Sequence, residues 1–151
     1  MTGVQTCALP ISAVEGLLAR IKAAKPAAPA IERTAAKRPE RGGDEIAIFD
    51  IAQAFNEAAK GKDVCLTKLP IGWNARYRDL KDPLDYLGSD GGGGLGAGPG
   101  TMVGAALALK DSGRIVAGVH GDGDFLMGIT ALWTAVRYKL PCLSIISNNR
   151  G

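Results

Sequence analysis

The chain contains 151 residues with a net charge of +3, and 46% of its residues are hydrophobic and 22% charged. This length is sufficient for one domain with a buried core. The net charge is small and the basic residues are spread out, so the composition does not indicate a nucleic-acid-binding protein. No apolar run approaches the roughly 18 residues of a membrane span. The cysteines lie far apart without metal-ligand spacing, which favours free thiols in a reducing compartment and hence a cytoplasmic protein.

The first 43 residues differ in character from the rest of the chain. Residues 1–11 share no pattern with the later residues and lack the basic start and long apolar core of a signal peptide, so we interpret them as a non-native leader. Residues 12–43 combine a short amphipathic helical pattern, Ser12 to Lys25, with a stretch rich in alanine, proline, lysine and arginine. That stretch has few bulky apolar residues, which is typical of a flexible linker between domains.

Residues 44–151 carry the patterns of a folded α/β domain. Asp44 can cap a helix that runs to about Lys60, and residues Asp63 to Leu69 form a candidate strand. The chain stops at Gly151, just after a further strand candidate and at a point where a sheet would have to continue. We therefore expect a fragment, whose domain is truncated at the C-terminus.

A glycine-rich segment, Gly88 to Gly100, holds eight glycines in thirteen residues. Such a segment lacks side-chain bulk and tolerates positive φ, so its backbone can approach a ligand closely. A flexible linker is disfavoured because strongly patterned elements flank the segment, and Thr101 to Lys110 reads as a small-residue helix. A dinucleotide-binding fingerprint is also disfavoured, since no strand directly precedes the glycines.

The last part of the chain reads as one βαβ unit. Two apolar runs predict strands, and they flank a tight turn and a helical pattern that ends before Pro141. In chain order these elements are Ile115 to His120, Gly121 to Asp124, Phe125 to Tyr138 and Cys142 to Ser147.

Polar residues come after both of these strands. Asp122 lies in the turn that follows the first strand, and Asn149 lies twenty-seven residues later, after the second. Parallel strands end at the same edge of a sheet, where open α/β sheets bind their ligands. A glycine-flanked Asp by itself is typical of a simple turn. Together with the asparagine pair, however, it supplies the oxygen ligands that hold a hard divalent cation such as Mg²⁺ against a diphosphate.

The stretch GDGDFLMGITALWTAVRYKLPCLSIISNNRG resembles the thiamine diphosphate (ThDP) motif, which begins with Gly-Asp-Gly and ends in Asn-Asn. With the preceding glycines, residues Gly88 to Gly151 resemble the diphosphate-binding domain of ThDP enzymes of the acetolactate synthase and benzoylformate decarboxylase type. The resemblance implies an α/β fold, with a parallel sheet covered by helices on both faces. This domain would occupy residues 44–151 and would be incomplete.

The resemblance also implies roles for particular residues. Mg²⁺ would be held by the side chains of Asp122 and Asn149 and by the backbone carbonyl of Gly151. A bulky apolar residue at Leu95 would force the two cofactor rings into a V, and the carbonyl of Gly93 would accept a hydrogen bond from the aminopyrimidine. The V brings the imino nitrogen close to the thiazolium carbon that it deprotonates. The remaining cofactor-binding positions of the motif are Gly121, Gly123 and Asp124, whose backbone would face the diphosphate.

The side chains of three residues in or beside the motif are also candidates for a role in the site. Asp124 adds a carboxylate beside the diphosphate, which is unfavourable unless the side chain points to solvent or caps the helix, and we expect it to cap the helix. His120, the only histidine, is more often a satisfied structural residue than a catalytic one. Met127 could line the cofactor pocket or pack in the core.

The function implied by the resemblance is ThDP- and Mg²⁺-dependent decarboxylation of a 2-oxo acid, with possible carboligation to a second carbonyl compound. Such an enzyme is a homodimer or homotetramer and takes an activating glutamate from a different domain, usually across a dimer interface. No glutamate of this chain lies in a recognisable context for that role, so we assign no catalytic residue here. The alternatives are a non-catalytic nucleotide- or phosphosugar-binding α/β domain and a truncated frame that does not fold alone.

Overall fold

The computed structural model of the chain describes residues 8–24, 36–38, 45–88 and 94–149. The chain divides into two compact units, residues 1–33 and residues 34–151. The first unit contains helix α1 (Ala8–Ala24), on which the apolar side chains of Val14, Leu17, Leu18 and Ile21 are exposed. No helix among the described residues combines the length and the apolar character that crossing a membrane requires.

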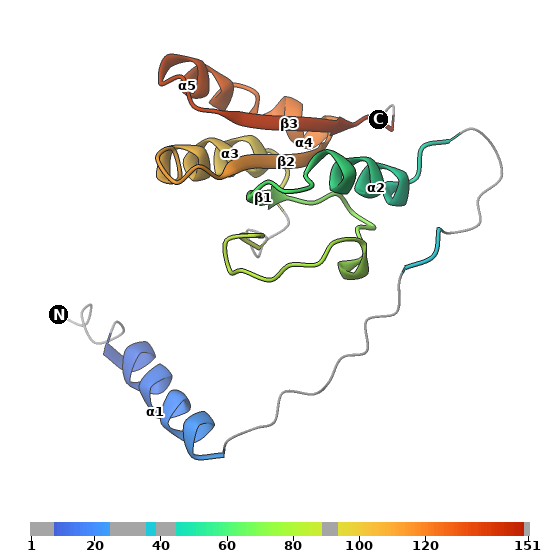
Figure 1. Cartoon of the computed structure of the whole chain (residues 1–151). Coiled ribbons are helices and arrows are strands. Elements are labelled where there is room, and N and C mark those ends of the chain that lie inside the picture. The colour runs from blue at the N-terminus through green and yellow to red at the C-terminus, as the bar shows by residue number, and fades with distance from the viewer. Residues whose placement is uncertain (1–7, 25–35, 39–44, 89–93, 150–151) are drawn as a thin grey trace. The chain divides into compact units, whose positions relative to one another are not determined.

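The second unit is built on a three-stranded parallel sheet in the order β1-β2-β3 (Figure 1). The strands are β1 (Val64–Lys68), β2 (Ile115–Gly121) and β3 (Cys142–Ser147). The helices are α2 (Ile48–Ala58), α3 (Ala97–Ala108), α4 (Asp122–Gly128) and α5 (Ala131–Arg137), with a 3₁₀ turn η1 (Ala75–Tyr77) between β1 and α3. All three strands lie where the apolar runs predicted them.

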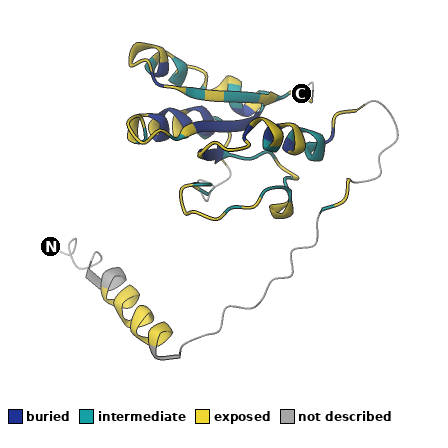
Figure 2. Cartoon of the chain, viewed as in Figure 1, coloured by how far each residue is buried: buried dark blue, intermediate teal, exposed yellow. Residues whose placement is uncertain are grey.

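Helices cover both faces of the sheet, as predicted. Strand residues alternate between the faces because successive side chains of a strand point to opposite sides. Cys65 and Val116 join a core cluster with α3 and α5, whereas Leu66 and Ala117 join one with Phe55 of α2. Burial is greatest along the middle strand and weaker along β3 (Figure 2). Parallel strands need this double cover, because both of their faces are apolar.

The helix predicted from Phe125 to Tyr138 is in fact two helices. Helix α4 begins at Asp122, directly after β2, and ends at Gly128, and α5 begins three residues later. Between them the backbone makes i→i−3 hydrogen bonds, such as Leu132 N–H to the Ile129 carbonyl at 3.0 Å. A Cβ at Gly128 would collide with the Gly96 carbonyl and lie 2.9 Å from Pro99 Cδ. The helix is therefore interrupted where its backbone packs directly against the start of α3.

The helix predicted to begin at Asp44 begins instead at Ile48, and Asp44 lies outside the described residues. Ala47 is the N-cap, and its backbone N–H donates to the Asp50 carboxylate at 2.9 Å. Asp50 also accepts two hydrogen bonds from the guanidinium of Arg38, each 2.9 Å long. These contacts lower the pKa of Asp50, the hydrogen bond from Arg38 most. The acidic group that satisfies this helix start is thus inside the first turn rather than before it.

Candidate functional site

The motif residues Asp122 and Asn149 lie at one edge of the sheet. Gly121, the last residue of β2, pairs with Ser147, the last residue of β3. Asp122 follows the first of these residues directly, and Asn149 follows the second by two positions. The register therefore brings a carboxylate and an amide to the carboxyl ends of two hydrogen-bonded strands, as the sequence predicted.

The surface of this turn is open. Asp122 is half-buried, and its Oδ1 accepts a hydrogen bond from the backbone N–H of Gly123 at 3.0 Å. A Cβ built at Gly121 or at Gly123 would meet nothing within 4 Å among the described residues, so these residues leave the glycine backbone accessible. Asn149 is exposed. Carboxylate and amide oxygens are hard donors that suit Mg²⁺.

Protein side chains alone do not complete a metal site in the described part of the chain. Those residues contain no cluster of three or more His, Cys, Asp or Glu side chains that could hold a metal ion. Mg²⁺ usually keeps several waters and binds through one or two carboxylates together with substrate phosphates. The donor set fits that mode of binding. Two other predicted positions, Gly93 and Gly151, lie outside the described residues.

Asp124 is buried and does not cap the helix, contrary to the expectation from sequence. Its side chain is 4% exposed, and its Oδ1 accepts a hydrogen bond from the backbone N–H of Gly96 at 2.8 Å. Lys68 Nζ lies 3.7 Å from the same oxygen, and His120 Nδ1 lies 3.4 Å from Oδ2. A buried carboxylate is stable only when paired and hydrogen-bonded, and these three partners provide both.

His120 is entirely buried, as expected of a structural histidine. Burial lowers its pKa below the ordinary value, an effect that the neighbouring Asp124 carboxylate opposes. A neutral ring that carries its proton on Nδ1 donates to Asp124 and leaves Nε2 unprotonated. Nε2 has no hydrogen-bond partner among the described residues. A bare nitrogen acceptor in that position avoids the higher cost of an unpaired N–H donor.

Two glycines make room for the His120–Asp124 pair. A Cβ at Gly98 of α3 would collide with Asp124 Oδ2 and lie 2.6 Å from His120 Nδ1, and a Cβ at Gly118 of β2 would collide with His120 Nε2. Real Cβ atoms do not make contacts this short, so positions 98 and 118 exclude residues larger than glycine. The close approach that glycine permits here is to the protein's own side chains.

Leu95 and Met127 present apolar side chains beside this cluster. Gly96, which follows Leu95, has a φ of +91°. It packs against Met127, because a Cβ built at Gly96 would lie 2.9 Å from Met127 Cβ. Leu95 is 66% exposed and Met127 is 68% exposed. Neither residue packs in the core, so both are available to cover an apolar ligand at the motif turn.

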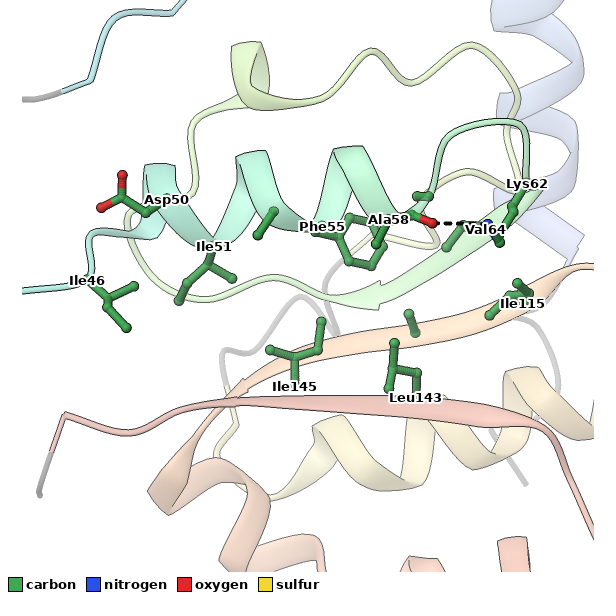
Figure 3. A pocket seen from close by; sticks show the side chains of 13 residues that line it. Ile46, Asp50, Ile51, Phe55, Ala58, Lys62, Val64, Ile115, Leu143 and Ile145 are labelled. Atoms are coloured by element: carbon green, nitrogen blue, oxygen red, sulfur yellow. Dashed lines mark hydrogen bonds between the residues drawn. The ribbon is translucent and has the colours of Figure 1, made fainter.

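The second unit also has an apolar groove away from the motif turn. The groove has a volume of about 720 Å³ and lies between α2 and the sheet (Figure 3). Ile51 and Phe55 of α2 line one side, and Leu143 and Ile145 of β3 line the other. None of the residues expected to bind the cofactor or the metal lines this groove. Its charged lining residues are engaged elsewhere: Asp50 pairs with Arg38, and Lys62 Nζ donates to the Ala58 carbonyl at 3.2 Å. An almost wholly apolar groove without convergent polar groups does not suit a diphosphate, so we place the site at the motif turn.

Sequence reasoning did not identify Lys68, Gly98 or Gly118 as parts of this cluster. Lys68 is the only charged residue of β1 and stands at its carboxyl end, which is a weak signal for the site edge. Gly118 is two residues from His120 and therefore on the same face of β2. Gly98 is hidden among seven other glycines of its segment, and nothing local distinguishes it.

The fold and the site define a parallel α/β domain whose sheet edge offers hard oxygen donors beside a glycine-rich segment. The family model described as "Thiamine pyrophosphate enzyme, C-terminal TPP binding domain" matches residues 70–151. This match covers more than half of the chain, and the chain belongs to that family.

Curated relatives and a solved structure agree with this assignment. The chain is 34% identical to benzoylformate decarboxylase of Pseudomonas aeruginosa over 140 residues, which cover 90% of the chain and 25% of that protein. It is 33% identical to the chloroplastic acetolactate synthase 2 of Brassica napus over 110 residues, 72% of the chain and 17% of that protein. The crystal structure of benzoylformate decarboxylase from Polynucleobacter necessarius matches with a TM-score of 0.66 at 21% identity, over 77% of the chain and 22% of that structure, which shows a shared fold. The chain thus spans a quarter or less of each of these proteins.

Proposed function

We propose that this chain supplies the diphosphate-binding half-site of a ThDP- and Mg²⁺-dependent enzyme that acts on 2-oxo acids. The observation that carries the proposal is the position of Asp122 and Asn149 at the ends of hydrogen-bonded strands, within the region that the family model matches. The family match also favours ThDP over a nucleotide or phosphosugar as the ligand. The named relatives include a decarboxylase and a synthase, so lyase and transferase chemistry on a 2-oxo acid are both candidates.

The proposed metal ligands are the side chains of Asp122 and Asn149 and the carbonyl of Gly151. The backbone of residues 121–124 would face the diphosphate, and Gly93 and Leu95 would contact the rings. When bound, ThDP supplies a thiazolium carbon that acts as nucleophile and electron sink. The protein's part is then to anchor the charged end at the sheet edge and to hold the rings against Leu95, so that their relative orientation is set before reaction.

Other parts of the active site are proposed to come from outside this domain. In the second unit, Glu45 is exposed and Glu57 pairs with Lys60. As the family resemblance implies, the activating glutamate would come from another domain or subunit. We accordingly propose a homodimer or homotetramer, in which residues 12–43 are a helix and linker and residues 44–151 the diphosphate-binding domain. Residues 1–11 are proposed to be non-native, and the protein to be cytoplasmic.

Calorimetric titration of ThDP into the full gene product, with Mg²⁺ present or with the metal chelated, tests the proposal. We expect saturable binding that requires the cation, followed by turnover of a 2-oxo acid from a panel that includes pyruvate and benzoylformate. ADP serves as the competing ligand. Binding of ADP without binding of ThDP would replace this function by that of a nucleotide-binding domain.

A further inference from the structure

The Asp124 carboxylate joins two segments that are distant in sequence. Its Oδ1 accepts the backbone N–H of Gly96, twenty-eight residues earlier, at 2.8 Å. A hydrogen bond to an ionised acceptor is roughly twice as strong as one between neutral groups. Because the Asp124 side chain is only 4% exposed, water does not compete effectively for this bond. The end of the glycine-rich segment is therefore fastened to the first turn of α4.

Gly96 is also held from its other side. It adopts a left-handed conformation with φ of +91°, and its carbonyl lies where a Cβ of Gly128 would be. Met127 Cβ would lie 2.9 Å from a Cβ on Gly96, so neither glycine could carry a side chain without displacing its neighbour. The amide of Gly96 faces Asp124 and its carbonyl faces the end of α4. Both contacts are to one short helix, which leaves little freedom for rigid movement between them.

The Asp124 carboxylate also contacts two strands of the sheet. Lys68 at the end of β1 lies 3.7 Å from Oδ1, and His120 of β2 lies 3.4 Å from Oδ2. Gly98 and Gly118 provide the space that this arrangement needs. Asp124 is thus oriented by two strands at once, and the bond to Gly96 passes that orientation on to the glycine-rich segment.

We propose that Asp124 is a positioning residue, which fixes Leu95 relative to the metal ligand Asp122 through its bond to Gly96. Leu95 precedes Gly96 directly, and Asp122 precedes Asp124 by two residues, so one carboxylate links the ring-supporting residue to the cation-binding turn. The inference rests on the proposed function for the roles of Leu95 and Asp122. The bond between Asp124 and Gly96 does not depend on it. Misplacement by about 1 Å in an active site can cost on the order of 10²-fold in rate, so such a link matters to the reaction.

The test compares Asp124→Ala with Asp124→Asn in the full gene product. Asn keeps the shape and an oxygen acceptor for Gly96, whereas Ala removes the acceptor. The matched control is Asp111→Ala, because the Asp111 side chain is 89% exposed in a turn and its carboxylate lies 4.0 Å from Lys110 Nζ. The first readout is hydrogen–deuterium exchange of the peptide that contains Gly96, measured without cofactor. The second is the rate of hydrogen–deuterium exchange at the thiazolium carbon, measured with ThDP and Mg²⁺ at saturation.

We expect Asp124→Ala to raise amide exchange at Gly96 by about 10–100-fold, the equivalent of a lost charge-assisted hydrogen bond. The thiazolium exchange should slow by at least about tenfold at saturating cofactor. Asp124→Asn keeps an oxygen acceptor for Gly96 but loses the charge that faces Lys68, so it should change both readouts less than Asp124→Ala does. Asp111→Ala should stay within about threefold of wild type in both readouts, a difference smaller than one hydrogen bond.

Two results would overturn the proposal. One is wild-type protection of Gly96 in Asp124→Ala. The other is loss of the cooperative thermal transition in Asp124→Asn as well as in Asp124→Ala, since the residue would then serve the fold as a whole. If the wild type bound no ThDP, the proposed function would fail. Hydrogen–deuterium exchange at Gly96 without cofactor would still test the hydrogen bond between Gly96 and Asp124.

Discussion

Replacing Gly98 by Ala places a methyl group where the His120–Asp124 pair lies. A Cβ at Gly98 collides with Asp124 Oδ2 and comes within 2.6 Å of His120 Nδ1 and 3.0 Å of its Cε1. Neither side chain can withdraw easily, because His120 is entirely buried and the Asp124 side chain is 4% exposed. Overpacking of this kind costs about 1–3 kcal/mol. Gly→Ala within a helix contributes about 0.5–1 kcal/mol in the opposite direction.

Gly104 is the matched control, because it lies in the same helix α3 and a Cβ there meets nothing within 4 Å in the described part of the chain. The helix-propensity gain roughly cancels between the two variants, so their difference isolates the overpacking cost of about 1–3 kcal/mol. Thermal unfolding of the full gene product measures it, and a cost of 1 kcal/mol shifts the midpoint by about 2–8 °C depending on domain size. We expect the order Gly104→Ala, wild type, Gly98→Ala from most to least stable. A Gly98→Ala protein as stable as Gly104→Ala would show that the pair does not fill that space.

Three further outcomes are expected. Asp122→Ala should abolish Mg²⁺-dependent retention of ThDP in calorimetry while leaving the thermal midpoint nearly unchanged, because this half-buried side chain is a proposed metal ligand and contributes little packing. Unchanged affinity for ThDP and Mg²⁺ would refute the metal assignment. Leu95→Ala should keep cofactor affinity but slow hydrogen–deuterium exchange at the thiazolium carbon, and wild-type exchange would remove Leu95 from the mechanism. The pKa of Asp85 is lowered to about 2 by hydrogen bonds from the backbone N–H groups of Asp82 and Lys81 and then from the Arg114 side chain. Because this folded-state pKa lies below the unfolded value of about 3.9, the contribution of Asp85 to stability is present above pH ~4 and is lost as the pH falls toward 2. The difference in thermal midpoint between wild type and Asp85→Asn should therefore shrink over that range, and a constant difference would contradict the assignment.

The strands and the site edge could be predicted from sequence because their signals are local. Apolar, β-branched runs determine where β2 and β3 lie, and the residue that follows a parallel strand must emerge at its carboxyl edge. Asp122 and Asn149 needed nothing more than this geometry. The start of α2 was misplaced because its N-cap, Ala47, has no side chain that signals a cap, and Asp50 within the first turn supplies the bond instead.

The position of Asp124 could not be predicted, because it depends on partners from three other elements. An acidic residue two positions into a helix is usually interpreted as a partner for unpaired backbone N–H groups nearby. Here the N–H that it accepts belongs to Gly96, and the charge that faces it belongs to Lys68 on β1. Whether the side chain turns inward is decided by the space beside His120, which is a property of the packed structure and not of the motif.

The role of individual glycines in the glycine-rich segment also could not be predicted from sequence. Sequence reasoning explained its glycines by the approach of a ligand to the backbone, but a Cβ at Gly98 would meet protein side chains, and one at Gly96 would meet Met127 of α4. At these two positions glycine is required by the protein's own packing, whereas at Gly100 and Gly104 a Cβ would enter open space. The same residue type therefore serves different purposes along a single helix. The contrast between Gly98 and Gly104 is measurable because the helix is shared and only the surroundings differ.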